Sequence, residues 1–96
     1  MAIQSHSVQR VQLIRAAVED ERRPTKAFLI SALQQCITVI RHERLDSRSL
    51  NFLNQIISEM MSTIDSMDDN DLDVTAVSET IDEVAYVLSS EIDPIY

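Results

Sequence analysis

The chain has 96 residues, of which 45% are hydrophobic, with no glycine, one cysteine and a net charge of −8. This length and apolar content are typical of a single folded domain over residues 1–96 and exclude a disordered tail. The absence of glycine excludes phosphate-binding glycine loops and disfavours hairpin-rich β folds. A lone cysteine excludes an intramolecular disulfide. A pI near 4.5 is far from the basic footprint expected of a nucleic-acid-binding domain.

Two helices are predicted in the first half of the chain, separated by Pro24. The first covers about residues 7–22, because its apolar residues recur at spacings of three and four. These residues are Val8, Val11, Ile14 and Val18. Ser5 or Ser7 is expected to cap its N-terminus. The second helix covers about residues 25–43 and is apolar on nearly all sides, which places it at the centre of a bundle or at an interface.

Two further helices are predicted on either side of an acidic turn at residues 68–73. The helix over about residues 47–67 has an apolar seam with alternating spacings of three and four. The seam consists of Leu50, Leu53, Ile57, Met60, Ile64 and Met67. The helix over about residues 74–90 repeats this spacing at Val74, Val77, Ile81, Val84 and Leu88. The expected N-caps are Asp46 or Ser47 for the former and Asp73 for the latter.

An antiparallel bundle of about four helices is the simplest way to bury four such stripes, so the predicted fold class is all-α. Leu33, Leu53 and Ile57 are expected in its core. The apolar surface of the second and third helices is wide for one subunit of this size, and Phe52, Ile56 and Met61 broaden the third helix beyond a two-stranded seam. We therefore expect a homodimer built on these two helices.

Charge is divided unevenly along the chain. Residues 1–48 contain all eight basic residues and have a net charge of +3, whereas residues 49–96 contain eleven acidic residues and no Lys or Arg. Small domains usually mix both signs on their surface, so the acidic half is a candidate for docking onto a basic protein surface. A face that only keeps the protein in solution is the alternative. The residues expected to bind the partner are Asp65, Asp68, Asp69, Asp71, Asp73, Asp82 and Glu83.

No pattern of catalytic, cofactor-binding or metal-binding residues is found. The acidic turn does not fit a calcium-binding loop, because registers that begin at Asp68 or Asp69 place unsuitable residues at the glycine position and at a ligand position. Cys36 and His42 are six residues apart on one predicted helix and point to different faces, which disfavours both a metal site and a nucleophile pair. Cys36 is expected to be a buried structural thiol.

The sequence therefore favours a non-catalytic adaptor or modulator of the regulator, chaperone, immunity or inhibitor type, acting on a protein partner. No cofactor, no direct contact with nucleic acid and no membrane attachment are expected. A cytoplasmic location is expected because the first ten residues lack the apolar core of a secretory signal. The alternative function is an inhibitor that mimics nucleic acid and occupies the site of a DNA- or RNA-binding protein. A small acid–base enzyme is a third hypothesis, which requires two carboxylates of perturbed pKa in a cleft.

Overall fold

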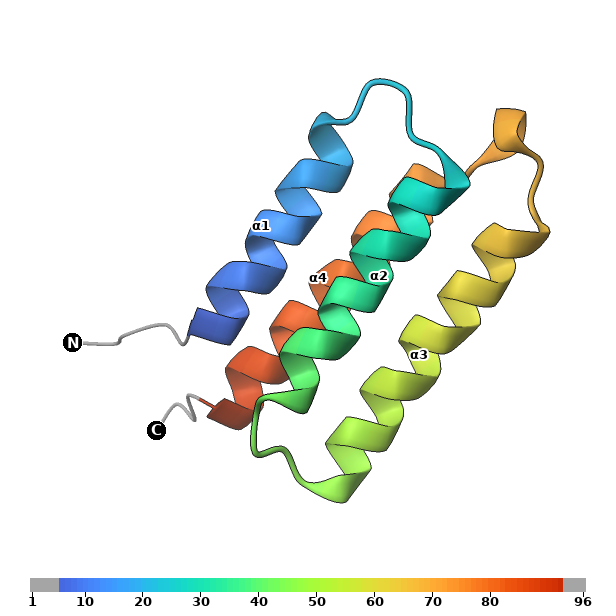
Figure 1. The fold of residues 1–96 in the computed structure, drawn as a ribbon. Helices are drawn as coiled ribbons and strands as arrows, with labels where there is room; N and C mark the ends of the chain where they lie inside the picture. Colours follow the sequence, from blue (N-terminus) through green and yellow to red (C-terminus); the bar gives the residue numbers. More distant parts are fainter. Residues whose placement is uncertain (1–5, 93–96) are drawn as a thin grey trace.

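The computed structural model describes residues 6–92, which form a bundle of four antiparallel helices (Figure 1). The elements are α1 (His6–Asp20), α2 (Lys26–Arg41), α3 (Ser47–Ser66), the short 3₁₀ helix η1 (Asp69–Asp71) and α4 (Val74–Ile92). This part of the chain contains no strand. The predicted all-α class is confirmed, and each predicted helix end lies within two residues of the observed one.

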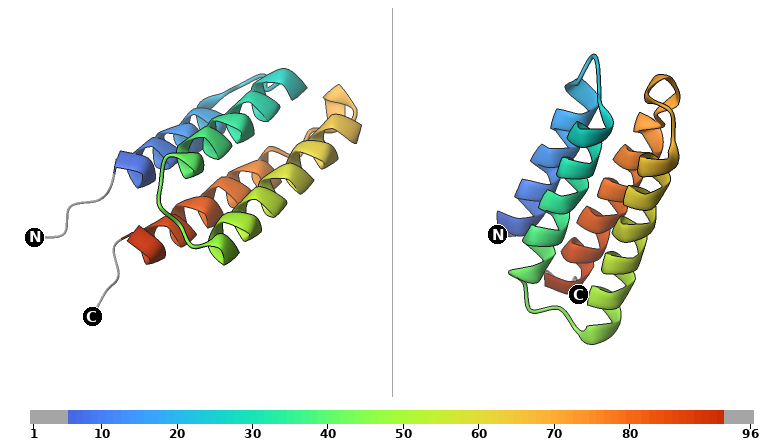
Figure 2. Two further views of the ribbon diagram at one scale, coloured as in Figure 1. Left: turned by 60° about the horizontal axis from the view of Figure 1, so that its bottom comes forward. Right: turned by 45° about the vertical axis from the view of Figure 1, so that its right-hand side comes forward.

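The four helices lie in two layers, with α1 beside α2 and α3 beside α4 (Figure 2). Contacts between the layers, α1 on α4 and α2 on α3, are more extensive than contacts within them, and the α3–α4 pair is the looser of the two layers. The α1–α2 connection and the acidic turn lie at the same end of the bundle (Figure 1). The layers therefore separate most of the Lys and Arg residues from most of the acidic half, although Arg48 lies in the first turn of α3.

Side-chain caps define where three of the helices begin. The Asp46 carboxylate accepts a hydrogen bond of 2.8 Å from the backbone N–H of Ser49, and the Asp73 carboxylate accepts one of 3.0 Å from that of Ala76. The hydroxyl of Thr25 caps α2 in the same way. Such caps satisfy backbone donors that have no partner within the helix. The predictions of Asp46 and Asp73 as N-caps are confirmed.

Of the two N-caps predicted for α1, Ser5 or Ser7, the second is excluded. Helix α1 begins at His6, so Ser7 lies inside its first turn and does not cap it, and Ser5 lies outside the described residues. The Ser7 side chain is buried, and its hydroxyl donates to the carboxylate of Glu43 after α2. A buried hydroxyl requires a hydrogen-bond partner, and this bond connects the start of α1 to the α2–α3 connection.

The core lies along the axis of the bundle and contains Leu33, Leu53 and Ile57, all fully buried as predicted. Among the described residues, α2 contributes the most buried side chains to this core, and it contacts α1, α3 and α4. Its buried residues are Leu29, Ala32, Leu33, Cys36, Val39 and Ile40. Most of the apolar residues of α2 are thus buried within the chain.

The apolar seam of α3 is only half internal. Leu53, Ile57 and Ile64 are buried, whereas Leu50, Met60 and Met67 are partly exposed. Helix α3 therefore leaves several apolar side chains partly open to solvent.

The backbone of the described residues has no residue with a positive φ. The three connections between helices are built from residues in ordinary right-handed and extended conformations. A chain without glycine can adopt them without strain.

Candidate functional site

The acidic turn forms an exposed cluster at one end of the bundle. Asp65 lies in the last turn of α3, and Asp68, Asp69 and Asp71 surround η1, where the N–H of Asp71 donates to the carbonyl of Asp68 at 2.9 Å. These four carboxylates are exposed and form no ion pair with the described residues. Asp73 belongs to the same end, but its carboxylate caps α4. The turn thus presents uncompensated negative charge on a short, defined backbone.

Lys26 lies close to this cluster without neutralising its carboxylates. Its ammonium donates to the backbone carbonyl of Asp65 at 2.9 Å. This carbonyl belongs to the last turn of α3, whose carbonyls lack partners within the helix and attract a cation. The contact connects the start of α2 to the end of α3.

Asp82 is separated from the acidic turn and is paired within the chain. It lies about 13 Å along α4 from Asp73, at 1.5 Å per residue, and its carboxylate accepts a hydrogen bond of 2.8 Å from the guanidinium of Arg15 on α1. Arg15 also binds the carboxylate of Glu19 at 2.8 Å, and Glu19 accepts a further bond from the hydroxyl of Ser78. This exposed network connects α1 to α4.

The network shifts the pKa values of two of its members. The hydrogen bond from Arg15 and then that from Ser78 hold the pKa of Glu19 below its usual value. The hydrogen bond to Glu19 and then the charge of Asp82 raise the pKa of Arg15. Ion pairs between exposed groups contribute little to stability because solvent screens them. The chief consequence is that Asp82 is partly neutralised, unlike the turn.

A groove lies between α3 and α4. On α3 it is lined by Phe52, Ile56 and Met60, and its volume is about 410 Å³. Its α4 side consists of Ala76, Glu79, Thr80 and Glu83. The side chain of Phe52 is 44% exposed.

Two short side chains line the α4 side of the groove. Ala76 and Thr80 lie opposite the long side chains of α3 and do not fill the space between the helices. Farther along α4, Tyr86 is 70% exposed and lies beside Glu83. The groove therefore has an apolar floor, a carboxylate edge on α4 and an exposed aromatic residue near one end.

The seven predicted partner-binding residues thus fall into three places. Five lie at the turn, Glu83 lies on the edge of the groove, and Asp82 lies next to Glu83 but pairs with Arg15 of α1. Phe52 and Glu79, which line the groove, were not among the predicted binding residues. The sequence feature that could have identified Phe52 as a binding residue is its position four residues before Ile56 and outside the apolar seam.

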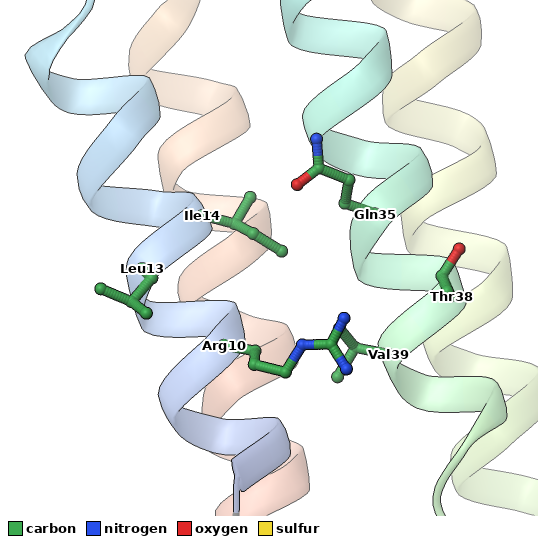
Figure 3. Close-up of a pocket in the computed structure, with 6 residues that line it drawn as sticks. All are labelled: Arg10, Leu13, Ile14, Gln35, Thr38 and Val39. Atoms are coloured by element: carbon green, nitrogen blue, oxygen red, sulfur yellow. The ribbon is translucent and has the colours of Figure 1, made fainter.

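A second hollow lies between α1 and α2 on the other layer (Figure 3). It has a volume of about 300 Å³ and is lined by Arg10, Leu13, Ile14, Gln35, Thr38 and Val39. Arg10 extends from α1 toward α2 across this hollow, whereas Leu13 points away from α2 (Figure 3) and is 68% exposed. Its only charged lining residue is basic, so its chemistry is opposite to that of the α3–α4 groove.

The residues considered for nucleophilic or metal chemistry lie apart. Cys36 is buried in the core, and burial raises the pKa of its thiol to about 12. His42 is exposed after α2, with its Nδ1 atom 2.9 Å from the backbone carbonyl oxygen of Thr38. Within residues 6–90, no three His, Cys, Asp or Glu side chains are grouped so that they could hold a metal ion. The prediction of Cys36 as a buried thiol is confirmed.

Comparison with known proteins gives no relative: no family model, no curated protein and no solved structure matches this chain. Among the helices of the described segment, none combines the length and apolarity needed to cross a bilayer.

Proposed function

We propose that this protein is a non-catalytic adaptor or modulator of the cytoplasm that binds a protein partner through the acidic layer, defined as α3, η1 and α4. The observation that carries this proposal is the sign and exposure of its charges. From residue 51 to residue 90, every charged side chain is a carboxylate and each of them is exposed. Of these carboxylates, only that of Asp82 forms an ion pair with another described residue.

Charge of one sign on a rigid surface speeds the encounter with a partner of the opposite sign. The surface expected on the partner is therefore basic. The turn cluster and the groove edge contribute most to this attraction, because their carboxylates form no ion pair with the described residues, whereas Asp82 pairs with Arg15.

Neutralising part of the turn is expected to weaken the complex. The double variant Asp69→Asn and Asp71→Asn should lower the affinity about fivefold, since exposed charge pairs each contribute about 0.5 kcal/mol. Asp73 is left unchanged because it caps α4. The partner is first identified by comparing proteins captured from source-cell extract by the wild type and by the variant, and binding of the purified partner is then measured as salt rises.

The matched control for this variant is Asp20→Asn with Glu21→Gln. It removes the same number of negative charges at the same end of the bundle, but from the exposed last residue of α1 and the exposed residue after it. The control should bind like the wild type, and rising salt should slow association chiefly for wild type and control. Equal affinity and equal salt dependence for all three proteins would show that the turn is only a solvated connection and does not bind the partner.

The alternative function, a mimic of nucleic acid, predicts a different competition result. A mimic would occupy the partner's DNA- or RNA-binding site, so that added nucleic acid would displace it. The apolar groove beside the carboxylates favours the adaptor over the mimic, since the row of phosphates that a mimic imitates has no apolar counterpart. Competition between duplex DNA or RNA and the protein for the purified partner separates the two.

The homodimer on α2 and α3 is retained as a prediction. Its support is the partly exposed apolar surface of α2 and α3 outside the α3–α4 groove, which includes Ile30, Ile37 and Met61. Light scattering at micromolar concentrations is expected to give twice the monomer mass of 10.9 kDa. A monomer mass across this range would leave the exposed surface of α3 free for a different protein.

A further inference from the structure

The floor of the α3–α4 groove has the dimensions of two turns of helix. Phe52, Ile56 and Met60 are spaced four residues apart on α3, and they span about 12 Å at 1.5 Å per residue. A helix that lies in an apolar groove contributes anchors at positions i, i+4 and i+7, which span a similar length. The partly exposed aliphatic and aromatic side chains of α3 therefore match one face of an amphipathic helix.

Carboxylates flank this floor on both sides. Glu79 and Glu83 line the α4 edge. On α3, Glu59 follows Ile56 by three residues and therefore lies on the same side of the helix; its carboxylate accepts a bond of 3.1 Å from the Gln55 amide. The nearest basic residue of α3 is Arg48, one turn before Phe52 at the end of the groove.

The same edges argue against a second copy of this chain in the groove. A two-fold contact pairs each surface patch with itself. Such a contact would bring Glu59, Glu79 and Glu83 of both copies together, and like charges across an interface are costly. A cationic helix avoids this cost and gains from all three carboxylates.

We infer that the α3–α4 groove binds a single amphipathic helix of the partner, with apolar residues along one face and Lys or Arg on both flanks. This inference rests on the proposed function and specifies the kind of segment that the partner presents. The apolar anchors would contact Phe52, Ile56 and Met60. The cationic flanks would pair with Glu59 on one side and with Glu79 and Glu83 on the other.

The test uses three synthetic peptides of about 18 residues, five turns of helix, and the full-length protein. The first has Leu at i, i+4 and i+7 with flanking Lys and Arg; the second is a scramble of the same composition; the third carries Glu in place of Lys and Arg. Binding is measured by fluorescence anisotropy at several salt concentrations. The first peptide should bind at least about tenfold more tightly than the scramble, and the acidic peptide should not bind.

Variants of the protein locate the site. Phe52→Ala should weaken binding of the first peptide about tenfold, the loss typical of a central interface contact. Leu13→Ala is the matched control, because Leu13 is a more exposed apolar residue on the other layer, and it should leave affinity unchanged. Glu79→Gln with Glu83→Gln should weaken binding and flatten its salt dependence, whereas Asp69→Asn with Asp71→Asn should have little effect. Circular dichroism verifies that each variant retains its helices.

Three results would overturn the inference. The first is equal affinity for the amphipathic peptide and its scramble, which would indicate attraction by charge alone. The second is binding that Phe52→Ala does not change. The third is a homodimer that Phe52→Ala dissociates, which would assign the groove to a second copy. If the peptide fails but the purified partner still binds with the salt dependence and turn-variant effect given above, the groove assignment is wrong and the proposed function stands.

Discussion

Ile57→Ala is expected to lower the free energy of unfolding by about 2–5 kcal/mol, the range found when a buried aliphatic side chain is truncated to Ala. Ile57 is fully buried near the middle of α3, and its side chain is among the largest in the core. Its position away from both helix ends leaves no route by which fraying could relieve the cavity. Urea unfolding of wild type and variant, followed by circular dichroism, measures the difference.

The neighbouring isoleucine provides a control with identical chemistry. Ile56 lines the groove and is only partly buried, so Ile56→Ala should cost about 1 kcal/mol or less, in proportion to the smaller area it removes from water. The contrast between two adjacent residues tests the rotation of α3 about its axis. Equal losses for the two variants would contradict the observed orientation of α3.

We expect Cys36 to lower the free energy of unfolding as the pH rises from about 9 to 12. Burial raises the pKa of the Cys36 thiol from 9.0 to about 12 in the folded protein. Between these values the unfolded chain has lost the thiol proton while the folded chain retains it, so the free energy of unfolding falls with rising pH. At about 1.4 kcal/mol per pKa unit, the loss approaches 4 kcal/mol at the upper end.

Replacement of the thiol isolates this effect from other groups that titrate in alkali. Cys36→Ala creates a small cavity and should be less stable than wild type at pH 7, but it lacks the Cys36 contribution to the pH profile. The stability advantage of wild type should therefore shrink, and then reverse, as urea unfolding under reducing conditions is repeated from pH 7 to pH 11. Parallel profiles for the two proteins would show that the thiol is accessible to solvent in the folded state.

The helices were predictable because their apolar residues follow a period of 3.6, which depends only on local sequence. The caps at Asp46 and Asp73 were predictable for the same reason, since the capping bond joins residues three positions apart. Ser7, one of the two N-caps considered for α1, lies inside the helix instead, and its hydrogen-bond acceptor, Glu43, lies 36 positions along the chain. A tertiary partner, which no local pattern reveals, replaced the capping role.

Two features of the site also depend on tertiary structure. The period of α2 does not show how many helices surround it, so an interface and a central position were equally compatible with its sequence. The pairing of Asp82 with Arg15, 67 positions apart, separates this carboxylate from the turn cluster. The groove brings Phe52, Ile56 and Met60 of α3 beside Ala76 and Thr80 of α4, and that register is fixed only when the two helices pack.

The backbone without positive φ angles has a consequence for the unfolded ensemble. Glycine is the residue that loses most conformational freedom on folding, and its replacement stabilises a protein chiefly by restricting the unfolded chain. A sequence of 96 residues without glycine therefore begins folding from a narrower set of conformations than an average chain of its length. For a small bundle whose α3–α4 layer is incompletely packed, this lower entropy cost helps to keep the folded state populated while the groove stays open.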